Sequence, residues 1–307
     1  MPPPRKPRPE RWTEHAVTAE QAGATVQEVL TGPLGVSRRM IQRLTRSDGI
    51  RLNRRTAYLG KKVREGDVVS VRMSANEDAG LEPEEMPLSI VHEDADVLVL
   101  DKPPHVFVHP TSPEQRGTLA HGIAHHWKQM RLHAKVRPVH RLDRDTSGLL
   151  LVAKTAFAHQ HLDRQLRERT LRRTYLAFVR GGVEGDEGTV DAPIGRHRAN
   201  PNLRSVRPDG EPALTRWHVL ERWADATLLE VELETGRTHQ IRVHMAHLGH
   251  PVLGDRQYAP RDRSPARRQA LHASRISFAH PTTGERMELE VPLPQDMATL
   301  RASLRTR

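Results

Sequence analysis

The chain has 307 residues, of which 48 are Lys or Arg and 38 are Asp or Glu, so its formal net charge is +10 at pH 7. A chain of this length accommodates one large domain and a small one, and the positive charge favours a polyanionic partner such as RNA or DNA. The absence of cysteine excludes disulfides, thiolate nucleophiles and zinc sites with sulfur ligands. It fits a reducing compartment, and we expect the protein in the cytoplasm.

The N-terminal residues are basic and rich in proline. Residues 1–10 contain no apolar stretch of the kind that a secretory signal requires. We therefore expect residues 1–22 to form a disordered basic tail. No uncharged apolar run approaches the ~20 residues needed to cross a bilayer. We expect a soluble protein without a membrane partner.

Residues 23–72 are predicted to form a small α/β module. A short helix is expected over residues 26–30, and Ser37 is placed to cap a second helix. Two strands are expected over residues 50–53 and 68–71, the second preceded by turn residues. The second helix has an apolar stripe made of Met40, Ile41 and Leu44.

A cationic stripe lies on another side of that helix, at Arg39, Arg43 and Arg46, where spacings of four and three residues bring the side chains together. An isolated stripe of this kind is usually a solvated face. Beside a short hairpin, in a chain with excess positive charge, we expect these arginines to bind RNA.

Residues 73–86 are acidic and poor in apolar side chains, as in a linker, so we place a domain boundary there. Residues 87–307 are predicted to form one domain. Apolar runs over 97–100 and 148–152 and alternation over 174–179 and 229–233 indicate strands. Helices are expected around residues 162–166 and over residues 239–248, with Thr238 as the cap of the second. The fold class is α+β, with a mixed, mainly antiparallel sheet flanked by helices and loops.

Residues 138–155 concentrate charged and hydroxyl side chains directly before a buried strand, and side chains at such a position are candidate site residues. Asp143 is flanked by Arg141 and Arg144, and the two cations favour the charged carboxylate, which suits a nucleophile. A turn held together by Asp–Arg pairs accounts for the same residues equally well on chemistry alone.

The stretch HRLDRDTSGLLLVAKT resembles the signature of the RluA family of pseudouridine synthases. Further motifs of that family follow in order, at residues 172–181, 210–222, 235–258 and 271–273, so the resemblance covers most of the chain. It implies that Asp143 is the catalytic aspartate, that Tyr175 is the active-site tyrosine and that Arg242 pairs with the aspartate. Arg173 stands where the family commonly has lysine.

This resemblance implies an isomerase that detaches uracil from its ribose and rejoins it through a ring carbon, with no cofactor and no metal. The target nucleotide has to be extruded from RNA structure, and Arg141 could fill the gap or hold a phosphate. Residues 23–72 resemble the alpha-L RNA-binding module of a small-subunit ribosomal protein. The expected partner is RNA, ribosomal RNA of the large subunit above all, with transfer RNA left open. We expect a monomer.

Three other functions fit the sequence less well. A metal site would draw on the histidines at 239, 244, 247 and 250 or on those at 121, 125 and 126. His244 and His247 are three residues apart and could share a helical face, but His239 and His244 are five apart and do not, and no acidic residue lies at HExxH spacing. A non-enzymatic ribosome-associated protein would need the basic module but not the ordered Asp143, Tyr175 and Arg242. A glycoside hydrolase would use Asp143 and Asp145 as paired carboxylates, yet aromatic residues for sugar stacking make up only 4% of the chain.

Overall fold

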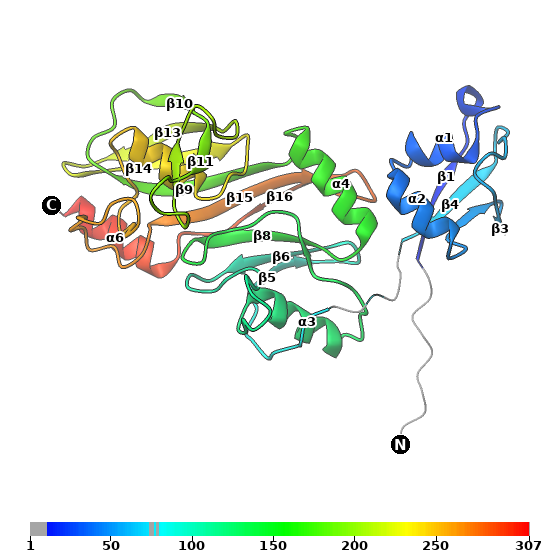
Figure 1. The fold of residues 1–307 in the computed structure, drawn as a ribbon, viewed down its shortest axis with the longest axis horizontal. Coiled ribbons are helices and arrows are strands. Elements are labelled where there is room, and N and C mark those ends of the chain that lie inside the picture. The colour runs from blue at the N-terminus through cyan, green and yellow to red at the C-terminus, as the bar shows by residue number, and fades with distance from the viewer. Residues whose placement is uncertain (1–10, 74–76, 78–79, 307) are drawn as a thin grey trace, which may run out of the picture.

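The computed structural model describes residues 11–73, 77 and 80–306, which form a small N-terminal module and a large domain (Figure 1). The module contains β1 (Trp12–Ala16), η1 (Ala19–Gln21), α1 (Val26–Thr31), α2 (Arg38–Thr45), β2 (Ile50–Leu52), β3 (Arg55–Thr56) and β4 (Val68–Arg72). Its four strands form an antiparallel sheet in the order β1-β4-β2-β3. The sheet is consistent with the alpha-L module that the sequence resembles.

Helix α2 has the two faces that its sequence predicts. The Ser37 side chain accepts a hydrogen bond from the Met40 backbone N–H at 3.3 Å, which caps the helix. Met40, Ile41 and Leu44 are buried in the module core. Arg39, Arg43 and Arg46 are exposed.

The prediction of a disordered tail over residues 1–22 is wrong for residues 12–21. Trp12–Ala16 pair with β4 along their whole length, from Trp12 opposite Arg72 to Ala16 opposite Val68. This strand supplies the partner that the free side of β4 would otherwise lack, and the Arg51 guanidinium lies 4.0 Å from the centre of the Trp12 ring. Long-range pairing of this kind leaves no local sequence signal. Residues 1–10 lie outside the described residues.

The large domain is built around one mixed sheet. Its strands are β5 (Ile90–Glu93), β6 (Val97–Lys102), β7 (Arg137–Pro138), β8 (Ser147–Ala153), β9 (Arg172–Arg180), β10 (Glu187–Asp191), β13 (Leu214–Arg222), β14 (Ala226–Leu233), β15 (Leu271–Ala279) and β16 (Arg286–Glu290). Eight follow the order β10-β13-β14-β9-β15-β8-β6-β5, with β16 beside β15 and β7 beside β8. Only β8 and β15 pair in parallel among these strands. The predicted α+β class and mixed sheet are confirmed.

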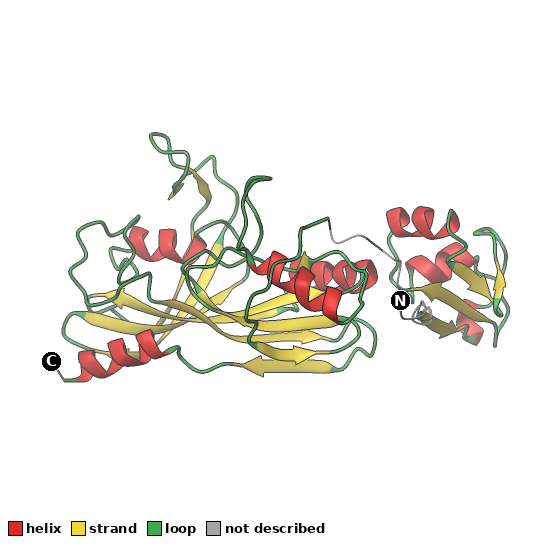
Figure 2. Ribbon diagram, turned by 90° about the horizontal axis from the view of Figure 1, so that it is seen from below, coloured by secondary structure: helices red, strands yellow, loops and turns green. Residues whose placement is uncertain are grey.

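Helices and one small hairpin complete the domain. The helices are α3 (Leu119–Gln129), α4 (Ala156–Arg167), α5 (Gln240–His247) and α6 (Gln295–Arg305), and the hairpin is β11 (Ile194–Arg196) with β12 (Arg204–Val206). Side chains alternate along β9, so that Tyr175 and Val179 pack in the same cluster as Met245 of α5. Phe178 points the other way and packs with Leu300 of α6. Figure 2 shows α6 along one face of the sheet, next to the C-terminus.

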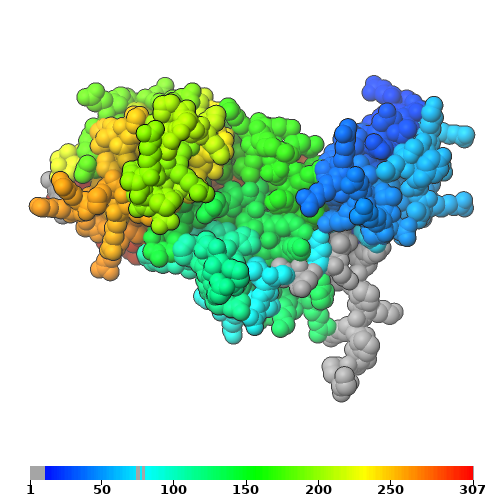
Figure 3. All heavy atoms as spheres, in the orientation of Figure 1, coloured from blue at the N-terminus to red at the C-terminus, as the bar shows by residue number. Residues whose placement is uncertain are grey.

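The module is in contact with the large domain, mainly through α4 (Figure 3). Phe157 of α4 is buried within the module core. The Gln160 side-chain oxygen accepts a hydrogen bond from the Ser37 backbone N–H at 2.8 Å, and the ring of His161 contacts the Leu34 carbonyl at 3.2 Å. Parts of the predicted linker, residues 74–76 and 78–79, lie outside the described residues.

Glu77, within that predicted linker, joins the two parts electrostatically. Its carboxylate pairs with Arg43 of the module at 2.7 Å and with Arg137 of β7. Among the residues that the structure describes, every helix falls short of the length and apolarity that a bilayer-spanning segment needs.

Candidate active site

One pocket of the large domain gathers the residues that the sequence singled out. It opens between the loop before β8, strand β9 and the start of α5. Asp143, Tyr175 and Arg242 line it together with Arg141 and His239. The three predicted catalytic residues, separated by up to 99 positions, therefore converge.

The loop that carries Asp143 is held through its backbone. A tight turn closes when Thr146 N–H donates to the Asp143 carbonyl at 3.1 Å. Lys102, fully buried at the end of β6, donates to the carbonyls of Arg144, Pro103 and Val106 at 2.8 to 2.9 Å. Burial lowers the pKa of Lys102 to about 7. These contacts fix the loop without occupying the Asp143 side chain.

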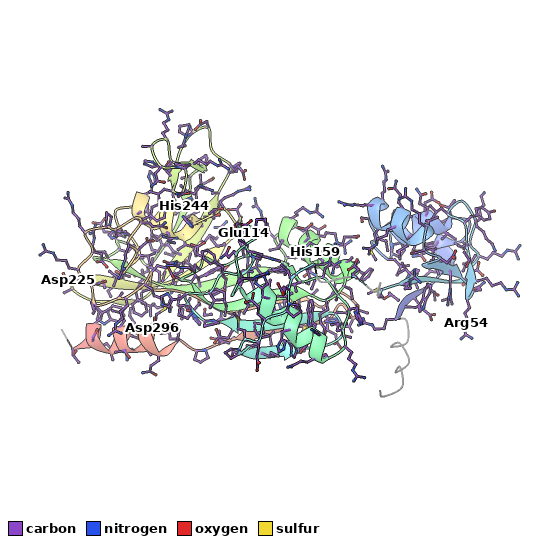
Figure 4. The ribbon with its side chains drawn as sticks, turned by 60° about the horizontal axis from the view of Figure 1, so that its bottom comes forward. Arg54, Glu114, His159, Asp225, His244 and Asp296 are labelled. Atoms are coloured by element: carbon purple, nitrogen blue, oxygen red, sulfur yellow. The ribbon has the colours of Figure 1, made fainter. Side chains whose placement is uncertain are left out.

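A second buried side chain, that of Arg268, holds the same loop. Arg268 donates to the Asp145 carbonyl at 2.9 Å and to the Ser147 hydroxyl at 3.1 Å. Its guanidinium also pairs with Asp296 of α6 at 2.7 Å, and Asp296 is labelled in Figure 4. The C-terminal helix is thereby connected to the Asp143 loop, so a rigid scaffold positions the carboxylate.

Arg242 makes the direct contact with Asp143. Its Nη1 donates to Asp143 Oδ2 at 2.9 Å, while Nε and Nη2 form a bidentate pair with Asp255 at 2.6 and 2.9 Å. Nη2 also donates to Gln257 Oε1 at 2.6 Å. Burial alone would lower the pKa of Arg242, but the hydrogen bonds and charges of Asp255 and Asp143 outweigh it and raise the pKa. The guanidinium is therefore permanently charged.

Asp255 orients this arginine. It is fully buried, and its Oδ1 also accepts hydrogen bonds from the backbone N–H groups of Gln257 and Tyr258 at 3.0 and 3.1 Å. A buried carboxylate with this many donors stays in one rotamer. Asp255 and Arg242 therefore form a fixed base from which Nη1 reaches the more exposed Asp143, whose side chain is 17% accessible.

Tyr175 lies in the pocket wall on β9 and is buried, with 4% of its surface exposed. Burial raises the pKa of Tyr175, and the negative charge of Asp143 acts in the same direction. The side chain is therefore a neutral phenol at neutral pH. An aromatic ring beside a carboxylate can stack on a flat heterocycle that enters the pocket.

Asp145 lies outside the pocket lining. Its carboxylate accepts hydrogen bonds from Arg144 at 3.0 Å and contacts His105 Nδ1 at 2.8 Å. Burial on its own would raise the pKa of Asp145, but these two partners lower it. Asp145 therefore does not line the pocket with Asp143, where a glycoside hydrolase would need its second carboxylate. Asp145 matches the turn held by Asp–Arg pairs that was the alternative interpretation of this segment.

The remaining predicted residues are at the surface. Arg141 is exposed at the pocket rim. In the module, Arg43 is paired with Glu77, whereas the side chains of Arg39 and Arg46 form no hydrogen bond or ion pair within the described residues. The cationic stripe is therefore partly neutralised at its centre.

The start of α5 differs from its prediction. The N-cap is His239 in place of Thr238, with φ 59° and ψ 21°, which is the left-handed region. A β-branched Thr is strained in that region, whereas His tolerates it better. His244 is a packed histidine that contacts the Thr215 hydroxyl at 2.8 Å and the Ala192 carbonyl at 2.9 Å, at the base of the β11–β12 hairpin (Figure 4).

Sequence reasoning missed Lys102, Arg268 and Asp255 as parts of the site. Each acts from a strand end or loop whose position near Asp143 arises only from the tertiary fold. A sequence signal existed for two of them, because Lys102 follows an apolar strand and Asp255 lies in the motif at residues 235–258 that resembles the family. Arg268 had no such signal.

Comparisons with known proteins identify the family of the chain. A family model described as RNA pseudouridylate synthase matches residues 96–247. The chain is 44% identical to the uncharacterized RNA pseudouridine synthase YlyB of Bacillus subtilis, over 88% of this chain and 90% of that protein. It is 38% identical to ribosomal large subunit pseudouridine synthase D of Haemophilus influenzae, over 94% of each chain.

A solved structure, human RNA pseudouridylate synthase domain containing 1, matches with a TM-score of 0.57 and 29% identity. The match covers 74% of this chain and 98% of that one. Fold, pocket and similarities together define an RNA-modifying isomerase. The chain belongs to the RluA family of RNA pseudouridine synthases.

Proposed function

We propose that this enzyme converts specific uridines of large-subunit ribosomal RNA to pseudouridine, with Asp143 as the catalytic carboxylate. The observation that carries the assignment of the site is the Asp143–Arg242 contact of 2.9 Å in a pocket that Tyr175 also lines. The ribosomal substrate is supported by the similarity to the Haemophilus influenzae enzyme, whose name specifies the large ribosomal subunit. We expect the enzyme to act as a monomer in the cytoplasm, where ribosomes are assembled.

The reaction requires one glycosidic bond to be exchanged for another. Asp143 attacks the nucleoside or assists cleavage of the bond between ribose C1′ and uracil N1, the base rotates, and a bond forms between C1′ and C5. The proton on C5 is then lost and N1 gains one, so the product is an isomer of the substrate. No electrons are exchanged, and the proposed reaction uses neither cofactor nor metal.

Arg242 holds the Asp143 carboxylate in one orientation, and the residues that fix Arg242 and the Asp143 loop keep the pair in place when RNA enters. Tyr175 stacks on the extruded uracil and helps to remove the C5 proton. Arg141, at the rim, occupies the gap that the base leaves or binds a neighbouring phosphate. The place of these side chains around one pocket supports the proposed roles.

Replacing Tyr175 by Phe separates stacking from the hydroxyl. Tyr175→Phe should bind RNA nearly as well as the wild type but turn over at least about 10²-fold more slowly, at a step after base detachment. Tyr175→Leu, the matched variant without a ring, should lose affinity as well. Rapid-quench kinetics and filter binding measure the two effects. Wild-type rates in Tyr175→Phe would remove the hydroxyl from the mechanism.

The module arginines are expected to bind RNA phosphates. Arg39→Ala combined with Arg46→Ala should weaken binding to long ribosomal RNA fragments and reduce the slope of log affinity against log salt by about two units, roughly one for each phosphate that is no longer neutralised. Arg43→Ala is the matched control, because Glu77 already neutralises that charge. Turnover of a short hairpin should be unchanged in both proteins. An unchanged salt slope in the double variant would exclude the phosphate contacts.

Point variants test the module better than its removal. Phe157 is buried against the module core, so a chain without residues 1–73 would expose this ring. The RNA substrate itself is tested by mapping pseudouridine in total RNA from cells with and without the enzyme. Loss of pseudouridine from large-subunit ribosomal RNA would support the proposal. Loss from transfer RNA alone would mean that transfer RNA is the substrate instead.

A further inference from the structure

Two side chains of the segment from Gly254 to Tyr258 contact residues that line the pocket. Asp255 holds Arg242, as described above. Tyr258 contacts His239, with 2.9 Å between the Tyr258 hydroxyl oxygen and His239 Nδ1, and the two rings meet edge to face with centres 5.7 Å apart. One short loop thus positions two residues at the start of α5, and both face Asp143.

The hydrogen bonds of Tyr258 favour one tautomer of His239. The hydroxyl oxygen accepts from the Arg204 backbone N–H at 2.9 Å. Burial raises the pKa of Tyr258, so the hydroxyl keeps its hydrogen at neutral pH. Within the described residues, His239 Nδ1 is the one acceptor in contact with that hydroxyl. An accepting Nδ1 gives that hydroxyl its partner, and in the neutral ring this arrangement places the hydrogen on Nε2.

His239 Nε2 then presents an N–H group to the pocket. Burial lowers the pKa of His239 and outweighs the opposing charge of Asp143, so the ring is neutral at pH 7. The nearest acceptor described for Nε2 is Asp143 Oδ1 at 4.0 Å, which is too far for a hydrogen bond. The side chain is 16% accessible and lines the pocket. In this tautomer a donor with no hydrogen-bond partner among the described residues faces the pocket beside the carboxylate.

The backbone conformation of His239 also indicates a functional role for its side chain. His239 has a positive φ of 59°, a conformation that non-glycine residues adopt at a cost. The left-handed turn directs the ring toward Asp143 and Tyr258 instead of along the helix. Strain of this kind at a pocket residue indicates that the position of the ring matters.

We propose that His239 Nε2 donates a hydrogen bond to a carbonyl oxygen of the target uracil, and that Tyr258 is a positioning residue which keeps the donor in place. The proposal rests on the proposed function and deepens it. With Tyr175 stacked on one face of the ring, uracil is recognised along its edge, where its two carbonyl oxygens lie. A neutral donor suits this role because, unlike an imidazolium, it does not compete with Arg242 for the Asp143 carboxylate.

The test pairs changes in the enzyme with changes in the substrate. A synthetic RNA hairpin that the wild type converts is prepared with uridine, 2-thiouridine or 4-thiouridine at the target, since sulfur is the weaker acceptor. One of the two thio substitutions should lower kcat/KM of the wild type by about 10-fold. In His239→Asn, which tolerates a positive φ but is too short to replace Nε2, that penalty should vanish. Equal thio effects in both enzymes would overturn the role of His239.

Two further variants separate recognition from structure. Tyr258→Phe should reduce the same thio penalty without abolishing it, and His239→Gln, whose amide can supply a donor at similar reach, should restore part of it. Melting temperatures report any loss of fold. If His239 and Tyr258 had a purely structural role, the substitutions would lower stability and leave the thio penalties unchanged.

The tautomer can be measured without RNA, by ¹⁵N spectra of histidine-labelled protein with His239→Asn as the assignment control. The neutral form with hydrogen on Nε2 is expected at pH 7, and the Nδ1–H form or an imidazolium would contradict the proposal. Failure of the wild type to convert any RNA would instead contradict the proposed function. The two failures are therefore distinguishable.

Discussion

Asp143→Asn should abolish pseudouridine formation while RNA affinity stays equal or rises slightly. The substitution keeps the shape of the side chain and removes its charge and nucleophilicity, so turnover should fall by about 10⁴-fold or more, as when a member of a catalytic triad is disabled. Affinity should not fall, because a negative charge near the phosphates has gone. Nucleoside analysis of digested RNA measures turnover, and gel-shift titration measures affinity.

Asp145→Asn is the matched control for that change. Asp145 carries the same functional group two residues away but contacts Arg144 and His105 outside the pocket lining. It should therefore lose only part of the rate or some stability, through the loop. A wild-type rate in Asp143→Asn, or a folded but inactive Asp145→Asn, would mean that Asp143 is not the catalytic carboxylate.

Arg242→Met should lose both turnover and stability. The change leaves the fully buried Asp255 without its cation, and breaking a buried ion pair in this way costs about 3–5 kcal/mol of unfolding free energy. Turnover should fall with it, because Asp143 loses the donor that orients it. Denaturant unfolding and single-turnover kinetics measure the two losses.

A double variant separates those two losses. Arg242→Met combined with Asp255→Asn removes the stranded charge while the amide oxygen still accepts from the backbone of Gln257 and Tyr258. Stability should recover by roughly the energy of the uncompensated charge, a few kcal/mol, and activity should not. Recovery of activity in the double variant would contradict the role of Arg242.

Local sequence patterns were sufficient to predict the helices and strands whose buried face follows from the spacing of their own apolar residues. Helix α2, with Ser37 as cap and Met40, Ile41 and Leu44 buried, followed from helical spacing alone. Strand β9 likewise followed from its alternation. The strand at residues 12–16 and the contact of Phe157 with the module were not predictable, because both depend on partners distant in the sequence.

The sequence predicted the pocket residues of the candidate site but not the buried residues that hold them in place. The motifs that resemble the family marked Asp143, Tyr175 and Arg242, and the fold brings them to one pocket. The buried groups that hold them, Lys102 and Asp255, act through backbone carbonyls or a single guanidinium. Charged residues are buried only when the fold supplies partners, and the partners here come from segments far apart in the chain.

Tritium release tests the assignment of Asp143 most directly, because the C5 hydrogen of uracil leaves only when the new carbon–carbon bond forms. RNA labelled at C5 is incubated with the wild type, Asp143→Asn and Asp145→Asn, and the melting temperature of each protein is measured alongside. We predict release by the wild type, none by a fully folded Asp143→Asn and a reduced rate with Asp145→Asn. Release by Asp143→Asn at a rate near that of the wild type would contradict the assignment of Asp143 as the catalyst.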